Sequence, residues 1–101
     1  MQIVIGDTTY SSGKITAAMT RRALELTAEA LEAAEKAEKL KETKDTKETW
    51  ALLAAIESNI NLKARLVCDV FDGAFDEEAL MNSVSNGELN ALMNAIALGK
   101  S

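Results

Sequence analysis

Histidine is absent from this 101-residue chain, and cysteine occurs once, at Cys68. The lack of histidine removes the commonest general base and the commonest metal ligand of proteins. A single cysteine excludes an internal disulfide and a zinc site made of several thiolates, and it favours a reducing, cytoplasmic setting. Cys68 lies in an apolar run, so we expect a small core residue there. The sequence therefore predicts neither a catalytic centre nor a metal or cofactor site.

Aromatic and basic residues are also scarce. Aromatics make up 4% of the chain, and the formal net charge is −5. Nucleic-acid surfaces need clustered Lys and Arg to contact phosphates, and anionic membranes attract similar clusters, which are missing here. No segment approaches the roughly 20 apolar residues of a membrane-spanning helix. We therefore expect neither a nucleic-acid nor a membrane partner.

Carboxylates are plentiful in the last third, where no Lys or Arg occurs between Leu66 and Gly99. A calcium-binding loop needs ligands at alternate positions, and neither Asp69 nor Asp72 as its first residue supplies one at the third position. Asp76, by contrast, stands where a helix N-cap is expected, and the two glutamates after it complement the helix dipole. These charges are better explained as helix-start signals than as a metal site.

Proline is absent and alanine is abundant, which favours helix through most of the chain. The first long helix is predicted over residues 15–42, with a seam at Met19, Ala23, Leu26, Ala30, Ala33, Ala37 and Leu40. Its small residues permit close approach by another helix, and Leu24 and Leu31 lie to one side of it. A second long helix is predicted over residues 46–72, with a stripe at Leu53, Ile56, Ile60, Ala64, Val67 and Phe71. A short polar connection around residue 43 predicts an antiparallel pair. Trp50 either caps the core of this pair or is an exposed anchor for a partner.

The two ends of the chain carry different signals. Residues 1–13 combine β-prone runs with a turn at Gly6-Asp7, which predicts a small hairpin or an extended arm. This arm must dock on the helices or on another subunit, and we expect docking on the helices. After a break at Asp72-Gly73, residues 76–99 predict two short helices folded across the open end of the long pair. Ser85 and Glu88 have capping-box spacing, and Gly99 is a helix stop. We thus expect a mainly α fold in one domain, residues 1–101.

Two blocks resemble a known family. The first runs from Met1-Gln2-Ile3-Val4-Ile5-Gly6-Asp7-Thr8-Thr9-Tyr10 through Ile15-Thr16 to Arg21-Arg22-Ala23-Leu24-Glu25-Leu26. The second joins Arg65-Leu66-Val67-Cys68-Asp69-Val70-Phe71 to Phe75-Asp76-Glu77-Glu78-Ala79-Leu80 and Gly87-Glu88-Leu89. In this order and spacing, they resemble the tail assembly chaperones of long-tailed phages and prophages of Gram-positive hosts.

The resemblance implies a non-catalytic protein of the host cytoplasm that binds the tape measure protein, and tail tube subunits in some cases, and is absent from the mature virion. A homo-oligomer stays open. The candidate partner-binding residues are apolar and lie near or on the short helices: Phe71, Phe75, Leu80, Leu89, Leu92 and Met93. Two alternatives also stay open, namely a small structural virion protein such as a head–tail connector, and a small acidic helical adaptor or inhibitor.

Overall fold

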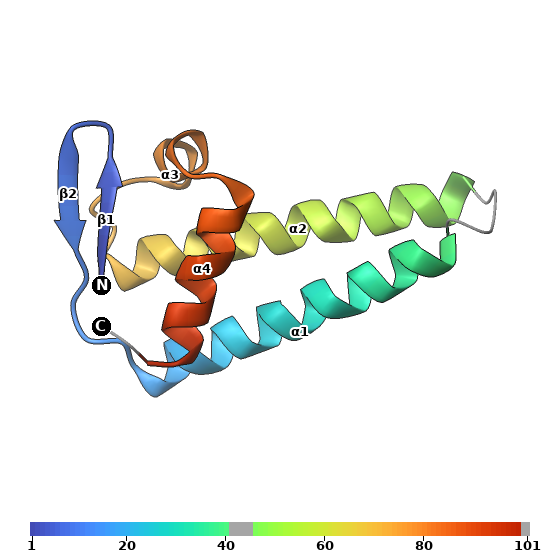
Figure 1. Ribbon diagram of the computed structural model, residues 1–101, viewed down its shortest axis with the longest axis horizontal. Coiled ribbons are helices and arrows are strands. Elements are labelled where there is room, and N and C mark those ends of the chain that lie inside the picture. Colours follow the sequence, from blue (N-terminus) through green and yellow to red (C-terminus); the bar gives the residue numbers. More distant parts are fainter. Residues whose placement is uncertain (41–45, 100–101) are drawn as a thin grey trace.

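The computed structural model describes residues 1–40 and 46–99 and shows a mainly helical fold (Figure 1). A two-stranded antiparallel hairpin, β1 (Gln2–Ile5) and β2 (Thr8–Ser11), is followed by the long helices α1 (Ala17–Leu40) and α2 (Thr46–Val70). Two shorter helices, α3 (Glu77–Ser83) and α4 (Asn86–Ala97), complete it. The predicted fold class is confirmed. Among described residues, the predicted helix bounds were two residues too wide at positions 15–16 and 71–72, and the connection around residue 43 lies outside the described residues.

The long helices pack side by side along the predicted seam of α1, where Ala23 and Leu26 are buried. The predicted stripe of α2 is wrong at Leu53, whose side chain is 51% exposed. The reason is a rotation of α2 about its axis: buried Asn59 donates a hydrogen bond to the Leu26 carbonyl over 2.9 Å, so the Asn59 side of α2 faces α1. Leu52, seven residues before Asn59, shares that side, and Leu53 is turned away from it.

The end of α2 contains the predicted break. Asp72 and Gly73 both have left-handed backbones, with φ of 55° and 70°. The Gly73 amide donates to the Cys68 carbonyl over 2.9 Å, and the Asp72 amide donates to the Asp69 carbonyl over 3.1 Å. This pair of hydrogen bonds is the Schellman arrangement, which satisfies the last carbonyls of a helix and reverses the chain. The turn sends the chain back so that α3 packs against α2.

Both short helices begin at the caps expected from sequence. The Asp76 side chain accepts a hydrogen bond from the Ala79 amide over 2.7 Å. Ser85 and Glu88 form a full capping box, in which each side chain accepts from the other residue's backbone amide. Such caps satisfy amides that have no partner inside the helix, and each contributes about 1 kcal/mol. Local sequence alone therefore sets where α3 and α4 start.

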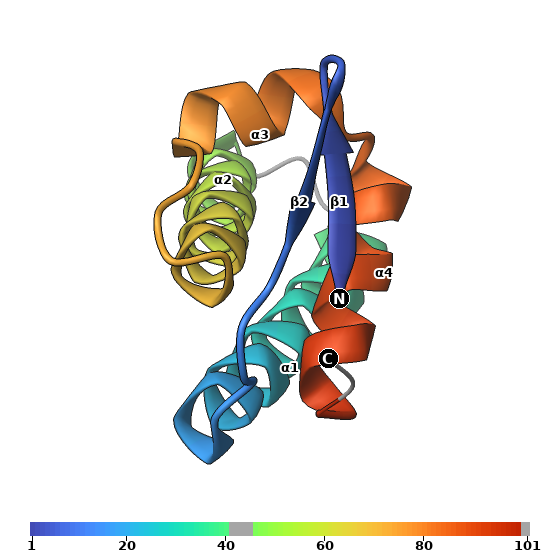
Figure 2. The ribbon, with the colours of Figure 1, turned by 90° about the vertical axis from the view of Figure 1, so that its left-hand side faces the viewer.

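The N-terminal segment is a hairpin and docks within the same chain. Its register pairs Gln2 with Ser11 and Ile5 with Thr8, which leaves a two-residue turn at Gly6-Asp7. Ile3 is buried in the core, and the Tyr10 ring meets the Phe75 ring edge-on at a centroid distance of 5.2 Å. β1 also contacts α3, as Figure 2 shows from the end of the molecule. The expected docking on the helices is therefore confirmed.

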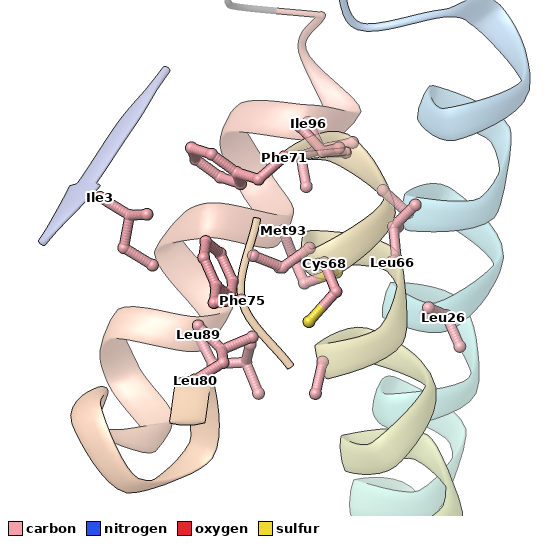
Figure 3. Close-up of a cluster of buried hydrophobic side chains, with 14 residues drawn as sticks. Ile3, Leu26, Leu66, Cys68, Phe71, Phe75, Leu80, Leu89, Met93 and Ile96 are labelled. Atoms are coloured by element: carbon pink, nitrogen blue, oxygen red, sulfur yellow. The ribbon is translucent and has the colours of Figure 1, made fainter. Parts of the chain in front are cut away.

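The core lies at the end of the long helices opposite their connection (Figures 1 and 3). There α4 crosses both long helices, as predicted, and is tied to each by a hydrogen bond. Thr20 Oγ1 donates to the Ile96 carbonyl over 3.0 Å, and Lys63 Nζ donates to Asn90 Oδ1 over 3.1 Å. Arg22 and Asp69 link α1 to α2 at the same end through an ion pair of 2.9 Å. We call this end of the molecule the base.

Candidate partner-binding surface

The six predicted partner-binding residues lie together in the base, but they point inward. Figure 3 shows five of them among the core side chains. Their exposed fractions are 3% for Phe71, 9% for Phe75, 0% for Leu80, 3% for Leu89 and 1% for Met93, and Leu92 is half-buried against the same core. They hold α3 and α4 on the long helices. A partner could reach the five buried side chains only if α3 and α4 moved away, so their role in binding stays a prediction.

Exposed apolar side chains lie instead on the long helices. Leu24 is 55% exposed, Leu31 64%, Leu53 51% and Trp50 68%. Trp50 therefore does not cap the core, and the other prediction for it, an exposed anchor, fits its position. The sequence already indicated that Leu24 and Leu31 lie beside the α1 seam, because they are offset from it by about one quarter of a turn or more. What the sequence did not show is that, within residues 1–40 and 46–99, no neighbouring element covers them.

These exposed residues continue the surfaces on which α4 packs. On α1, Leu24, Thr27 and Leu31 follow Thr20 at steps of four, three and four residues, so they share one side of the helix with the residue that bonds to α4. On α2, Ile60, Ile56 and Leu53 precede Lys63 at steps of three, four and three, and Trp50 lies three residues further on.

We call the two rows together, from Leu24 to Leu31 and from Ile60 to Leu53, the α4-side face, and Trp50, one turn before Leu53, lies at its outer edge. At the base this side of the long helices is covered by α4. Beyond α4, the same side exposes Leu31 and Leu53, and Trp50 is exposed at its outer edge.

A groove opens on the other side of the α1–α2 seam. Its volume is about 650 Å³. The floor is made of small and medium apolar side chains from both helices, and charged side chains stand along its edges. The lining residues are Glu29, Glu32, Ala33, Lys36, Lys39, Leu40, Glu48, Ala51, Leu52, Ala55, Ser58 and Asn59. Both signs of charge therefore border this groove.

The charges beside the α4-side face are mostly acidic. Glu35 follows Leu31 by four residues and Glu57 follows Leu53 by four, so each carboxylate lies one turn from an exposed leucine. Both glutamates are exposed. Arg21, three residues before Leu24, is the basic residue nearest to this row on α1, and it stands at the end next to α4. An apolar surface with an acidic border favours ligands with the opposite pattern.

The residues that the structure describes bear on two kinds of chemical site, a metal site and a reactive thiol. Across residues 1–40 and 46–99, no three His, Cys, Asp or Glu side chains are grouped to hold a metal ion. Burial raises the pKa of the Cys68 thiol to about 11, and the negative charges of Glu77, Asp69 and Asp76 add to the effect. Since the thiolate is the nucleophilic form, Cys68 is a poor nucleophile at neutral pH. Within the same residues, no helix has the length and apolar character needed to cross a bilayer.

A comparison with known protein families identifies the family of this chain. A family model described as phage tail chaperone protein matches residues 3–99. Because the match spans nearly the whole chain, the protein belongs to the phage tail chaperone family. Searches of curated proteins and of solved structures found no significant match. Family membership confirms the prediction of a non-catalytic protein, and it means that the chain acts in the host cell on proteins of the phage tail.

Proposed function

We propose that this tail chaperone binds the tape measure protein and keeps it soluble in the host cytoplasm until the tail is assembled. The phage or prophage would be a long-tailed one of a Gram-positive host, tail tube subunits would be a second partner, and the chaperone would be absent from the mature virion. Family membership supports tail proteins as the partner class. The sequence resemblance described above supports the finer assignments.

The observation that carries the proposal is the uncovered apolar surface of the long helices. Leu31, Leu53 and Trp50 are each more than half exposed on the long helices, beyond the part that α4 covers. A tape measure protein is a long helix with apolar stripes, and it aggregates when those stripes are left in water. Packing of one such stripe onto the long helices is helix-on-groove recognition. The net charge of −5 keeps the resulting complexes apart.

Co-expression tests the proposal. The tape measure protein of the same genome is produced with and without the chaperone, and its soluble fraction is measured after centrifugation. We expect it to be soluble only with the chaperone, and to co-elute with it in size-exclusion chromatography. Production with the tail tube protein alone is the parallel arm for the second partner. Equal insolubility of the tape measure protein with and without the chaperone would refute its assignment as the partner.

Analysis of purified particles separates the proposal from the structural alternative. A connector or other virion component is present at a fixed copy number in mature particles, whereas a chaperone leaves before completion. We expect quantitative mass spectrometry of purified virions to detect no stoichiometric amount of this chain. Its presence at a fixed ratio to tail tube subunits would favour a structural role instead.

A further inference from the structure

We propose that the α4-side face binds one amphipathic helix of the partner, that this helix crosses the long helices beside α4, and that basic side chains flank its apolar stripe. The inference rests on the proposed function, because it names the surface and the kind of segment through which a tape measure protein would be held. It does not depend on the six residues of the base, which are occupied in the core.

The first argument is continuity with α4. Inside the chain, α4 already shows how a helix is held on this side of α1 and α2: it crosses both, with Leu89, Met93 and Ile96 buried at steps of four and three (Figures 1 and 3). Leu24 and Leu31, which continue the α1 row beyond Thr20, are seven residues apart, which is about 10 Å along a helix. A helix with its side chains is about 10–12 Å wide. The uncovered surface therefore has room for one more crossing helix next to α4.

The second argument is charge. Leu31 and Leu53 each have a carboxylate one turn away, Glu35 on α1 and Glu57 on α2. A helix with Lys or Arg beside its apolar stripe would place cations near both carboxylates. A second copy of this chain would bring the same two glutamates against each other, and like charges oppose such contacts. The acidic border thus selects a basic partner over self-association.

The third argument concerns the groove on the other side of the seam. Lys36 and Lys39 stand along its edges together with Glu29 and Glu32, so its border does not select one sign of charge. Its apolar floor also consists largely of alanine, which offers less apolar area for a partner than leucine and tryptophan do. These differences favour the α4-side face as the site for the partner helix.

A peptide titration tests the inference without a tape measure protein. Two designed 18-residue helical peptides share one leucine stripe and lack aromatics, and differ only in flanking Lys or Glu. Trp50 is the one tryptophan of the chain, its side chain is 68% exposed, and it lies one turn from Leu53, so its fluorescence reports on a helix that covers Leu53 and the edge of this face. We expect the Lys-flanked peptide to shift the emission to shorter wavelength and to bind at least about tenfold more tightly than the Glu-flanked one. Equal affinities, or binding with no change in Trp50 emission, would overturn the inference.

Paired variants of the full chain locate the site. Leu31→Ser with Leu53→Ser removes apolar contacts from the α4-side face, and Leu62→Ser with Met81→Ser is the matched control on other exposed positions. Glu35→Lys with Glu57→Lys reverses the acidic border, and Glu29→Lys with Glu32→Lys makes the same change at the groove. Each α4-side pair is expected to weaken binding of the Lys-flanked peptide by roughly tenfold or more, and each control pair is expected to weaken it by less than about threefold. Circular dichroism and urea unfolding confirm that every variant folds.

The same variants distinguish this inference from the proposed function. If the wild-type chain solubilises the tape measure protein and the α4-side variants do so equally well, the function stands and the surface is wrong. If the wild-type chain does not solubilise it but binds the Lys-flanked peptide at Trp50, the partner assignment is wrong and the surface stands. Two results would refute the α4-side face as the partner site. One is weaker binding of the Lys-flanked peptide in the groove pair, Glu29→Lys with Glu32→Lys, and in no other pair. The other is a dimer of the chain at micromolar concentration that buries Trp50.

Discussion

The base and the distal half of the molecule are built on the same two helices, yet they differ in almost every physical respect. At the base, α1 and α2 are covered by α4, α3 and the hairpin, and Leu66, Leu80, Met93 and Ile96 are fully buried. The distal half, residues 27–40 and 46–58, consists of α1 and α2 alone, and no described residue there is buried. Two helices without a third layer cannot enclose large side chains. The buried core thus lies at one end, and the distal half leaves Leu31, Leu53 and Trp50 exposed.

The overall dimensions reflect this division. The molecule measures 45 × 28 × 17 Å, and its radius of gyration is 14.9 Å, compared with about 13 Å for a compact domain of similar length. The excess comes from the distal half, which extends away from the core (Figure 1). Its alanine seam lets the helices lie close, while the leucines beside the seam remain in contact with water. This is the surface that we propose binds a helix of the partner.

The largest contrast is expected from leucine truncation. Leu66→Ala at the base removes a fully buried side chain, and it should lower the free energy of unfolding by about 3 kcal/mol. Leu31→Ala in the distal half removes a side chain that is 64% exposed, and it should change that free energy by less than about 0.5 kcal/mol. Urea unfolding followed by circular dichroism measures both. Similar losses at the two sites would show that the distal half contributes to the core after all.

Thiol reactivity gives a second contrast. Cys68 is buried at the base, and at pH 8 its alkylation by iodoacetamide should be roughly a hundredfold slower than that of a cysteine placed in the distal half by Ala51→Cys in a Cys68→Ser background.

The raised pKa of the Cys68 thiol also predicts that stability depends on pH. The unfolded thiol ionises near 9.0 and the folded one at about 11, so the unfolding free energy should fall as the pH rises from 9 to 11. Cys68→Ser should lack this part of the decrease. In the alkylation experiment, equal rates for Cys68 and for the cysteine at position 51 would contradict the burial of Cys68.

The smallest effect concerns a charge at the base. Lys63 is buried, its Nζ bonds to the neutral Asn90 side chain, and burial lowers its pKa. Because keeping an ammonium there costs free energy, Lys63→Met should raise the unfolding free energy at pH 7 by about 1 kcal/mol. The gain should shrink at alkaline pH, since the folded wild type loses this proton below 10.5, where the unfolded chain still holds it. Urea unfolding at pH 7 and pH 10 measures both. A loss of stability at pH 7 would mean that the bond to Asn90 outweighs the cost of burial.

Local signals in the sequence predicted much of the fold. The caps at Asp76 and Ser85, the break at Asp72-Gly73 and the turn at Gly6-Asp7 are all where the residues placed them, because each depends on neighbours within a few positions. The candidate site was harder to predict. Leu89 and Met93 have the spacing of a binding stripe, and that spacing equally suits a helix that packs on its own chain.

The sequence by itself determined which segments become helices, where the two short helices start, and that the chain is acidic and lacks histidine. Only the tertiary structure decided which apolar rows are used up inside the chain. Periodicity shows that a row exists, but its exposure depends on whether another segment, distant in the sequence, crosses it. Here α4 covers the row at Thr20 and stops short of Leu31, so one continuous side of the same helix is core at one end and open surface at the other.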